Sequence, residues 1–259
     1  MPEVTSYATG QPCWADVTSP DVDAAAAFYG ELFGWQADKA PQPEAGGYTM
    51  FSKDGKYTAA ASPPMQGTEE VPPHWTVYLA ADDVDASARR VREAGGTVMM
   101  DPFDVFDAGR MVVAQDPTGA AFGVWQAGEH HGAQLANEPG SFTWNECQTT
   151  DPVAAAEFYK AVFGYGVDEW DMGQGEPYRV LKVGEKGVAG LSKFGPELDG
   201  TPPSWTTVFA VADADESVAT AQELGATLLV SPMDLPDIGR FAVLRDPVGA
   251  VFHVLANPS

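Results

Sequence analysis

The feature that most constrains this chain is an internal repeat with a fixed spacing. Trp14 has a counterpart 130 residues later at Trp144, and DPTGAAFGV at residues 116–124 has one in DPVGAVFHV at residues 246–254. The same offset relates four further pairs: Asp21 and Asp151, Tyr29 and Tyr159, Trp75 and Trp205, and Arg110 and Arg240. Because an insertion in either copy would shift every later match, the repeat predicts two domains with equal loop lengths. We expect them at residues 10–128 and 139–257, joined by the polar linker AGEHHGAQLANEP.

Each domain in turn contains two similar halves. In the first half, apolar residues recur at helical spacing over residues 22–33, between a capping Asp21 and Gly34. The second domain repeats the cap at Asp151 and the stop at Gly164. Short alternating runs separated by turns surround each helix, and Asp-Pro-x-Gly is typical of a type I turn. The order is strand, helix, three strands, four times over, which predicts an α+β fold of four βαβββ modules with mixed sheets.

Composition excludes several classes of protein. The formal charge of −23 repels nucleic acid phosphates and anionic lipid heads, so we expect no nucleic acid and no membrane partner. No run of about 18 apolar residues and no basic and apolar leader is readable, which favours a cytoplasmic protein. Cys13 and Cys147 do not occupy equivalent positions, which favours reduced thiols. The expected partner is a small molecule, and the expected assembly is a monomer or a homodimer.

Two patterns carry a family resemblance over almost the whole chain. One is a helix of the type D-x6-FY-x3-FG-[WY], and the other is a closing hairpin of the type GR-x5-DP-x-G-A-x-F. With the fourfold βαβββ order, they resemble the vicinal oxygen chelate superfamily, which includes glyoxalase I, bleomycin-resistance proteins and extradiol dioxygenases. The chain is similar to the tandem two-domain glyoxalase-like proteins of bacteria. The resemblance implies that paired modules curl their strands into a cup, with the helices outside and a ligand inside.

Strand alternation indicates which side chains face each cup, because successive residues point to opposite faces. Cys13, Ala15 and Val17 suit the helix side, which leaves Trp14 and Asp16 for the cup. The side chains expected to line the first cup are Trp14, Asp16, His74, Thr76, Tyr78, Met111 and Trp125. Those expected in the second cup are Trp144, Glu146, Gln148, Ser204, Thr206 and His253.

The resemblance also implies four inward positions for a divalent metal ion in each site. In the first domain they fall on or beside Trp14, Ala60, Thr76 and Gly123, and in the second on or beside Trp144, Gly190, Thr206 and His253. A metal ion needs several nitrogen or oxygen donors that converge from different strands. Sliding along the strands recovers two donors in each domain, Asp16 with His74 and Glu146 with His253. Two donors are too few, so we expect no metal and no other cofactor.

Three functions are then open. The first is a module that binds an aromatic or amphipathic small molecule in its cups, held by aromatic faces and oriented by Asp16, His74, Glu146 and His253. The second is a metal-independent lyase, isomerase or hydrolase in which Glu146 and His253 act as base and acid, provided that they approach within hydrogen-bond reach. The third is a metal-dependent enzyme of the lactoylglutathione lyase or dioxygenase type. A purely structural or protein-binding role has no sequence feature in its favour.

Each candidate also has a structural interpretation. The aromatic residues can fill a core, His253 can be a buried structural histidine, and Asp16 and Glu146 can be bonded to the backbone or to Arg110 and Arg240. Histidines 130 and 131 in the linker are expected to be a solvated pair. The two cups are expected to be unequal, because Gly123 opens space where the second domain has His253.

Overall fold

The computed structural model describes residues 3–171, 175–193 and 202–258. The first domain comprises β1 (Pro12–Thr18), α1 (Val22–Phe33), β2 (Gln36–Lys39), the short 3-10 helix η1 (Pro43–Ala45), β3 (Thr49–Lys53), β4 (Lys56–Ser62), β5 (His74–Ala80), α2 (Val84–Glu93), β6 (Thr97–Val105), β7 (Gly109–Gln115) and β8 (Ala121–Ala127). The second comprises β9 (Phe142–Thr149), α3 (Pro152–Phe163), β10 (Gly166–Trp170), β11 (Tyr178–Val183), β12 (Lys186–Lys193), β13 (Ser204–Val211), α4 (Ala214–Glu223), β14 (Thr227–Leu235), β15 (Gly239–Arg245) and β16 (Val251–Ala256).

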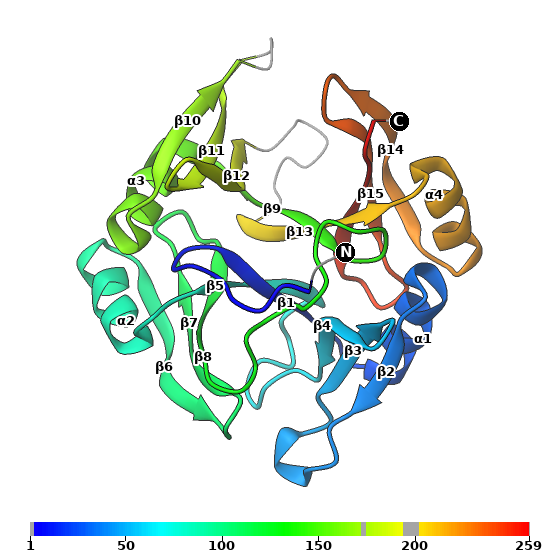
Figure 1. Ribbon diagram of the computed structural model, residues 1–259, viewed down its shortest axis with the longest axis horizontal. Coiled ribbons are helices and arrows are strands. Elements are labelled where there is room, and N and C mark those ends of the chain that lie inside the picture. The colour runs from blue at the N-terminus through cyan, green and yellow to red at the C-terminus, as the bar shows by residue number, and fades with distance from the viewer. Residues whose placement is uncertain (1–2, 172–174, 194–201, 259) are drawn as a thin grey trace.

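The predicted α+β fold of four βαβββ modules is confirmed. Each domain forms one eight-stranded mixed sheet, in the order β2-β3-β4-β1-β5-β8-β7-β6 for the first and β10-β11-β12-β9-β13-β16-β15-β14 for the second. In both sheets the first strands of the two modules pair antiparallel at the centre, β1 with β5 and β9 with β13. Figure 1 shows both sheets curving away from this centre in opposite directions, with the helices on their outer sides.

The helices begin and end where their capping residues predict. The side chain of Asp21 accepts a hydrogen bond from the Ala24 amide, and Asp151 does the same for Ala154, so one free amide at each helix start has a partner. Gly34 ends α1 in the left-handed conformation with φ of 72°, which glycine adopts without a steric penalty.

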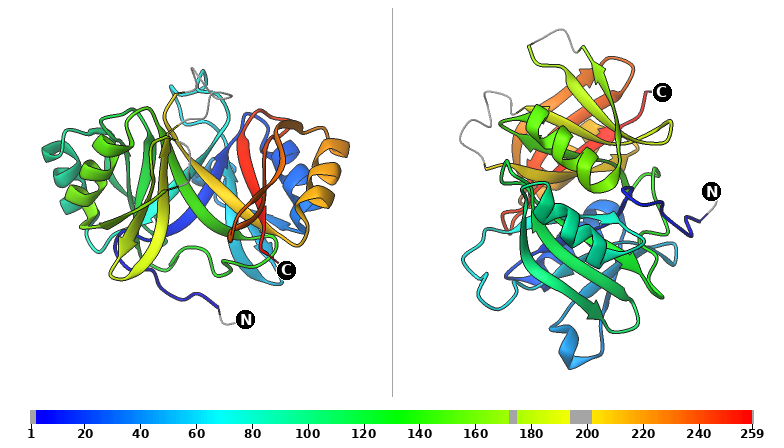
Figure 2. Two further views of the ribbon diagram at one scale, coloured as in Figure 1. Left: turned by 90° about the horizontal axis from the view of Figure 1, so that it is seen from above. Right: turned by 90° about the vertical axis from the view of Figure 1, so that its left-hand side faces the viewer.

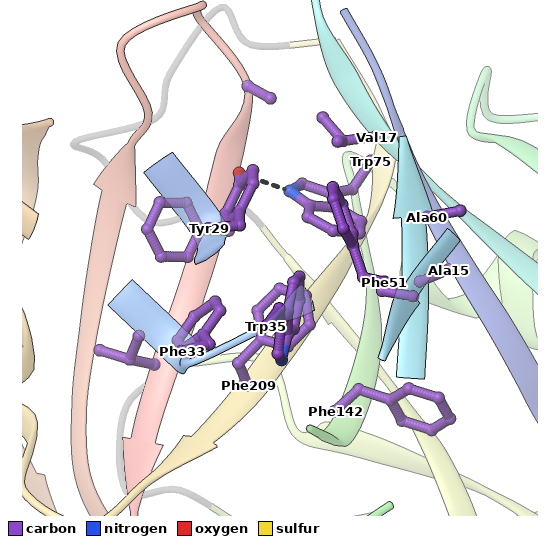
Figure 3. Packing of buried hydrophobic residues seen from close by; sticks show 14 of the residues in the cluster. Ala15, Val17, Tyr29, Phe33, Trp35, Phe51, Ala60, Trp75, Phe142 and Phe209 are labelled. Atoms are coloured by element: carbon purple, nitrogen blue, oxygen red, sulfur yellow. Dashed lines mark hydrogen bonds between the residues drawn. The ribbon is translucent and has the colours of Figure 1, made fainter. Parts of the chain in front are cut away.

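The two domains share their cores. Helices α1 and α4 lie together on one side of the molecule, and α2 and α3 on the other (Figures 1 and 2). One buried cluster joins the first module to the fourth, and the other joins the second to the third. Figure 3 shows Phe33 and Trp35 against Phe209 of the second domain, at ring-centroid distances of 5.0 and 5.5 Å. Burying this aromatic surface between the domains stabilises both of them.

A pair of equivalent hydrogen-bond networks locks the domains together. Tyr29 of α1 donates to Asp246 in the second domain at 2.8 Å. The Tyr29 hydroxyl also accepts a hydrogen bond from the Trp75 indole at 2.9 Å, which Figure 3 shows as a dashed line. At the equivalent positions of the other copy, the Tyr159 hydroxyl donates to Asp116 of the first domain and accepts from the Trp205 indole. Each aspartate is also the first residue of an Asp-Pro-x-Gly turn, and its side chain accepts hydrogen bonds from backbone amides of that turn. The repeated sequence features therefore build the interface between the domains.

The state of the two cysteines and the lengths of the helices can also be read from the structure. Cys13 and Cys147 are both free and buried, and burial raises the pKa of each thiol. Among the described residues, no helix is long and apolar enough to cross a membrane.

Candidate ligand-binding cups

The helix-free, concave faces of the two sheets are called cup 1, in the first domain, and cup 2, in the second. Strand phase is as predicted: Cys13, Ala15 and Val17 are buried in the helix-side core. Trp75 faces α1 through its bond to Tyr29. The residues that alternate with these along β1 and β5, among them Trp14, Asp16 and Tyr78, therefore face the cup.

Each cup contains the same three-residue hydrogen-bond network. In cup 1 the Trp14 indole donates to the Tyr48 hydroxyl at 2.9 Å, and that hydroxyl donates to the carboxylate of Asp16 at 3.1 Å. In cup 2 Trp144 donates to Tyr178 at 2.8 Å, and Tyr178 donates to Glu146 at 2.9 Å. The fixed repeat therefore extends to the interior of the cups, with an aspartate in one and a glutamate in the other.

The carboxylate of cup 1 is closed off from solvent. Asp16 is 4% exposed and accepts a second hydrogen bond from the Tyr78 hydroxyl at 2.9 Å. Burial raises the pKa of Asp16 to about 6, although the bonds from Tyr78 and Tyr48 act in the opposite direction. Asp16 thus holds its proton nearly to neutral pH.

The linker lies over cup 1, and the expected solvated histidine pair is wrong for His130. The His130 ring meets the rings of Trp14 and Trp125 edge to face, at centroid distances of 4.5 and 5.8 Å. The Trp125 indole donates to the His130 carbonyl at 2.8 Å. Packing against the two tryptophans removes the imidazole from water, and this burial lowers the pKa of His130 to about 4. His131 is exposed, as expected.

Further hydrogen bonds hold the first half of the linker against the first domain. The amides of Glu129 and His130 donate to the β6–β7 turn at Asp107 and Ala108. The Ala133 amide donates to the Cys13 carbonyl at 2.8 Å. Cup 1 is therefore covered by the protein's own chain.

Gly123 does not leave the open space that the sequence suggested. A Cβ atom on Gly123 would lie 2.2 Å from the Tyr78 ring, so the tyrosine fills the place that a side chain would take. In cup 2 the residue in register with His253 is Val208, the counterpart of Tyr78. The larger side chain of the pair is on β5 in the first domain and on β16 in the second. Glycine with tyrosine in cup 1 and histidine with valine in cup 2 are two ways of filling the same volume.

No hydrogen bond joins His253 and Glu146 among the described residues. His253 is 1% exposed, packs edge to face on Phe241, and its Nε2 has no hydrogen-bond partner among the described residues. Burial lowers the pKa of His253 to about 4, so the imidazole is neutral at physiological pH. The carboxylate oxygens of Glu146 accept hydrogen bonds from three other side chains: Tyr178, Ser192 and Gln148. The expected acid and base pair lacks the contact on which it depended.

Cup 2 is more accessible than cup 1. Trp144, Glu146 and Phe241 are half-buried, whereas Trp14, Asp16 and Met111 at the matching positions of cup 1 are buried. The network tyrosines Tyr48 and Tyr178 are half-buried in both cups. Gly190 makes the network of cup 2 possible, since a Cβ there would lie 1.7 Å from the Tyr178 hydroxyl oxygen.

The remaining predicted residues have mixed positions. In cup 1 Tyr78 and Trp125 are buried, while Thr76 is half-buried in register with Asp16. His74 lies at the rim, where its Nδ1 contacts the Pro72 carbonyl. In cup 2 Thr206 is buried, and its hydroxyl donates to the Glu146 carbonyl.

The two arginines do not serve the cup carboxylates. Arg110 pairs with Asp85 and Asp104. Arg240 pairs with Asp215 and Asp234. In each domain the arginine therefore links the helix to a neighbouring strand on the outer face, away from the cup.

A divalent metal ion of the kind that the superfamily implies does not fit the donors of either cup. The partners of Asp16 in register are Ala60 and Thr76, and those of Glu146 are Gly190 and Thr206. Within the described ranges no three His, Cys, Asp or Glu side chains converge. Neutral hydroxyl and amide donors already occupy both carboxylates, and those groups satisfy an oxygen acceptor rather than a cation.

Sequence reasoning missed Tyr48 and Tyr178, the central members of the two networks. They are 130 residues apart, so the repeat offset alone could have singled them out. It also missed the exposed Trp170, whose counterpart is Ala40. A position where only one copy carries an aromatic residue is a signal of divergence.

Comparisons with known families agree with this architecture. Residues 13–124 match the Glyoxalase/Bleomycin resistance protein/Dioxygenase superfamily, and residues 144–255 match a Glyoxalase-like domain. The chain belongs to this superfamily.

Two relatives align along nearly their whole lengths. One is CFP32 of Mycobacterium tuberculosis, whose name includes the word glyoxylase; it is 46% identical over 98% of both chains. The other is the anthracycline biosynthesis protein DnrV of Streptomyces peucetius, which is 43% identical over 97% of this chain and 95% of its own.

Solved structures show the same fold at low sequence identity. The Mn(II)-bound glyoxalase of Novosphingobium aromaticivorans has a TM-score of 0.65 at 18% identity, covering 96% of this chain and 82% of its own. The 2,3-dioxygenase LapB of Pseudomonas sp. KL28 has a TM-score of 0.67 at 11% identity, covering 97% and 94%.

Proposed function

We propose that this protein binds a small planar aromatic molecule in cup 2 by a mode that uses no metal ion. The observation that carries the proposal is the difference in access between the two cups. Trp144, Glu146 and Phe241 are half-buried in cup 2, whereas their counterparts Trp14, Asp16 and Met111 in cup 1 are buried and the linker residue His130 packs on Trp14. Aromatic walls with a few fixed polar groups are typical of small-molecule sites.

The anthracycline biosynthesis protein DnrV supports a polycyclic aromatic ligand. It is a full-length relative at 43% identity, and an anthracycline has the flat ring system that indole and phenol faces accommodate. The acid and base alternative has less support, because Glu146 and His253 have no mutual hydrogen bond. The metal-dependent alternative lacks a converging set of donors in the described part of the chain.

The anthracycline daunorubicin, which is fluorescent, provides a direct test. We expect its fluorescence anisotropy to rise in a saturable titration with the purified protein. Trp144→Leu removes one aromatic wall of cup 2 and is expected to weaken binding about tenfold, on the order of 1.4 kcal/mol. Phe106→Leu is the matched control, because Phe106 is an exposed aromatic residue in the β6–β7 turn of the first domain.

Two results would contradict the proposal. One is the absence of saturable binding to a folded protein. The other is an affinity that stays unchanged in Trp144→Leu, since the ligand would then lie elsewhere. A melting curve of each variant checks that the fold is retained.

A further inference from the structure

Cup 2 carries an aromatic residue at its rim that cup 1 lacks. Trp170 ends β10, is 48% exposed, and pairs in register with Tyr178 of β11, so both side chains lie on the cup face. The matching residue of the first domain is Ala40. The Trp144 indole and the Tyr178 hydroxyl are joined by a hydrogen bond of 2.8 Å, and no ring-to-ring packing of Trp144, Trp170 or Tyr178 is found among the described residues. Trp144 and Tyr178 are half-buried and Trp170 is exposed.

Glu146 sits beside these rings with neutral partners only. Its Oε1 accepts from the Ser192 hydroxyl at 2.6 Å and from the Gln148 amide at 3.1 Å. Its Oε2 accepts from Tyr178 at 2.9 Å. Within the described residues, no Lys, Arg or His side chain forms an ion pair with Glu146. A partly buried carboxylate gains most from a cation when none is already supplied.

On the face of the second sheet that carries Glu146, the basic side chains either form ion pairs with other acidic residues or lie on strands away from Glu146. Lys182 pairs with Asp168 at 3.1 Å and with Glu185 at 3.7 Å. Arg245 is exposed at the turn end of β15, and two strands, β13 and β16, lie between β15 and the strand of Glu146. His253 is surrounded by Val208, Val243 and Phe241 and belongs to another row of the sheet.

The matching carboxylate of cup 1 also has neutral partners, but it is more deeply buried than Glu146. Asp16 is 4% exposed and accepts hydrogen bonds from two tyrosine hydroxyls, Tyr48 and Tyr78. His130 and the linker lie over its network through Trp14. A cationic ligand therefore has a reachable carboxylate in cup 2 and none in cup 1.

We infer that cup 2 selects an aromatic ligand that carries a protonated amine, with Glu146 as its counter-ion and Trp144, Trp170 and Tyr178 as its aromatic wall. This inference rests on the proposed function. An ammonium group is attracted to the faces of indole and phenol rings as well as to a carboxylate. The net charge of −23 adds a long-range attraction for cations.

The test compares two probes that differ only in charge. Daunorubicin carries a protonated amine on its sugar, and its N-acetyl derivative keeps the same rings but is neutral. We expect the full chain to bind daunorubicin about tenfold more tightly than the N-acetyl derivative at low salt, and the difference to shrink as sodium chloride is raised. Equal affinities would overturn the inference and leave the proposed function standing. Failure of both probes to bind would contradict the proposed function, and the inference with it.

Matched variants identify the residues responsible. Glu146→Gln keeps an oxygen acceptor but removes the charge, so it is expected to abolish the preference for daunorubicin over the N-acetyl derivative, which is the ratio of the two affinities measured on the same variant. Asp16→Asn, the equivalent change in cup 1, is expected to preserve the preference. Persistence of the preference in Glu146→Gln would show that another group holds the amine and would overturn the assignment.

Trp170→Ala copies Ala40 of the first domain at an exposed position, so it leaves the fold intact. We expect it to weaken the binding of both probes at least threefold, because both stack on the same indole. Unchanged binding of both probes would remove Trp170 from the site.

Discussion

The two cups of this protein have the same framework and opposite degrees of closure. Both hold a tryptophan, a tyrosine and a carboxylate in one hydrogen-bond network, built from positions 130 residues apart. The linker packs on Trp14 in cup 1, where Trp14 and Asp16 are buried, while their counterparts Trp144 and Glu146 in cup 2 are half-buried. The hydrogen-bond network is thus the same in both copies of the repeat, whereas the segments that pack over it differ. The two cups therefore differ in the exposure of their network residues rather than in the kinds of residue that form the network.

The largest expected effect concerns the exchanged volumes. Gly123→His places a side chain where the Tyr78 ring lies 2.2 Å from the new Cβ, and we expect it to lower the free energy of unfolding by about 3 kcal/mol or more. Adding Tyr78→Val copies cup 2 and is expected to recover at least half of that loss. Urea unfolding of the parent, both single variants and the double variant measures the coupling. Additive effects would show that the two positions do not share one volume.

The second prediction concerns acid sensitivity. Because the pKa of His253 is lowered to about 4 in the folded protein from an ordinary 6.5, the unfolded chain binds the extra proton between these values. The contribution to stability is full above pH 6.5 and is lost as the pH falls toward 4, to a total of about 3 kcal/mol.

His253→Leu is therefore expected to flatten this part of the pH profile in urea unfolding. His131→Leu, at an exposed position of the linker, is the control and is expected to leave the profile unchanged. A profile that is equally steep in both variants would place the acid sensitivity elsewhere.

The third prediction runs in the opposite direction with pH. The pKa of Asp16 is raised to about 6 in the folded protein, so its contribution is full below pH 4 and is lost as the pH rises through 6. Relative to the parent, Asp16→Asn is expected to gain about 2 kcal/mol in free energy of unfolding between pH 4 and pH 8. A constant difference across this range would mean that Asp16 is ionised throughout in the folded state.

The smallest effect compares the two network tyrosines. Tyr48→Phe leaves the buried Asp16 and Trp14 each without one partner, at a cost of about 1–2 kcal/mol. Tyr178→Phe is expected to cost less than about 1 kcal/mol, because water reaches the half-buried Trp144 and Glu146. Thermal unfolding of the two variants checks the order, and a larger loss for Tyr178→Phe would contradict the assignment of cup 2 as the open cup.

The sequence predicted the fold because its signals are local and repeated. Helix caps at Asp21 and Asp151, and the alternation that turns Trp14 and Asp16 away from Ala15, depend only on neighbouring residues. The content of the cups depends on which strands lie side by side. Tyr78 fills the space over Gly123 because β5 and β8 are neighbours, although they are far apart in sequence.

The position of the linker was equally inaccessible to sequence reasoning. His130 is polar and lies between two domains, which favours solvent. Its burial follows from the rings of Trp14 and Trp125, which the fold presents at the mouth of cup 1. The absence of a hydrogen bond between Glu146 and His253 is likewise a matter of sheet register, since His253 pairs with Val208 and Glu146 with Thr206.

A crystal structure of the protein with bound daunorubicin tests the central claim most directly. The account predicts that the ring system lies in cup 2 against Trp144 and Tyr178, with the linker still seated on Trp14 and Trp125 in cup 1. A ligand in cup 1 with the linker displaced, or at a surface site with both cups unchanged, would contradict it.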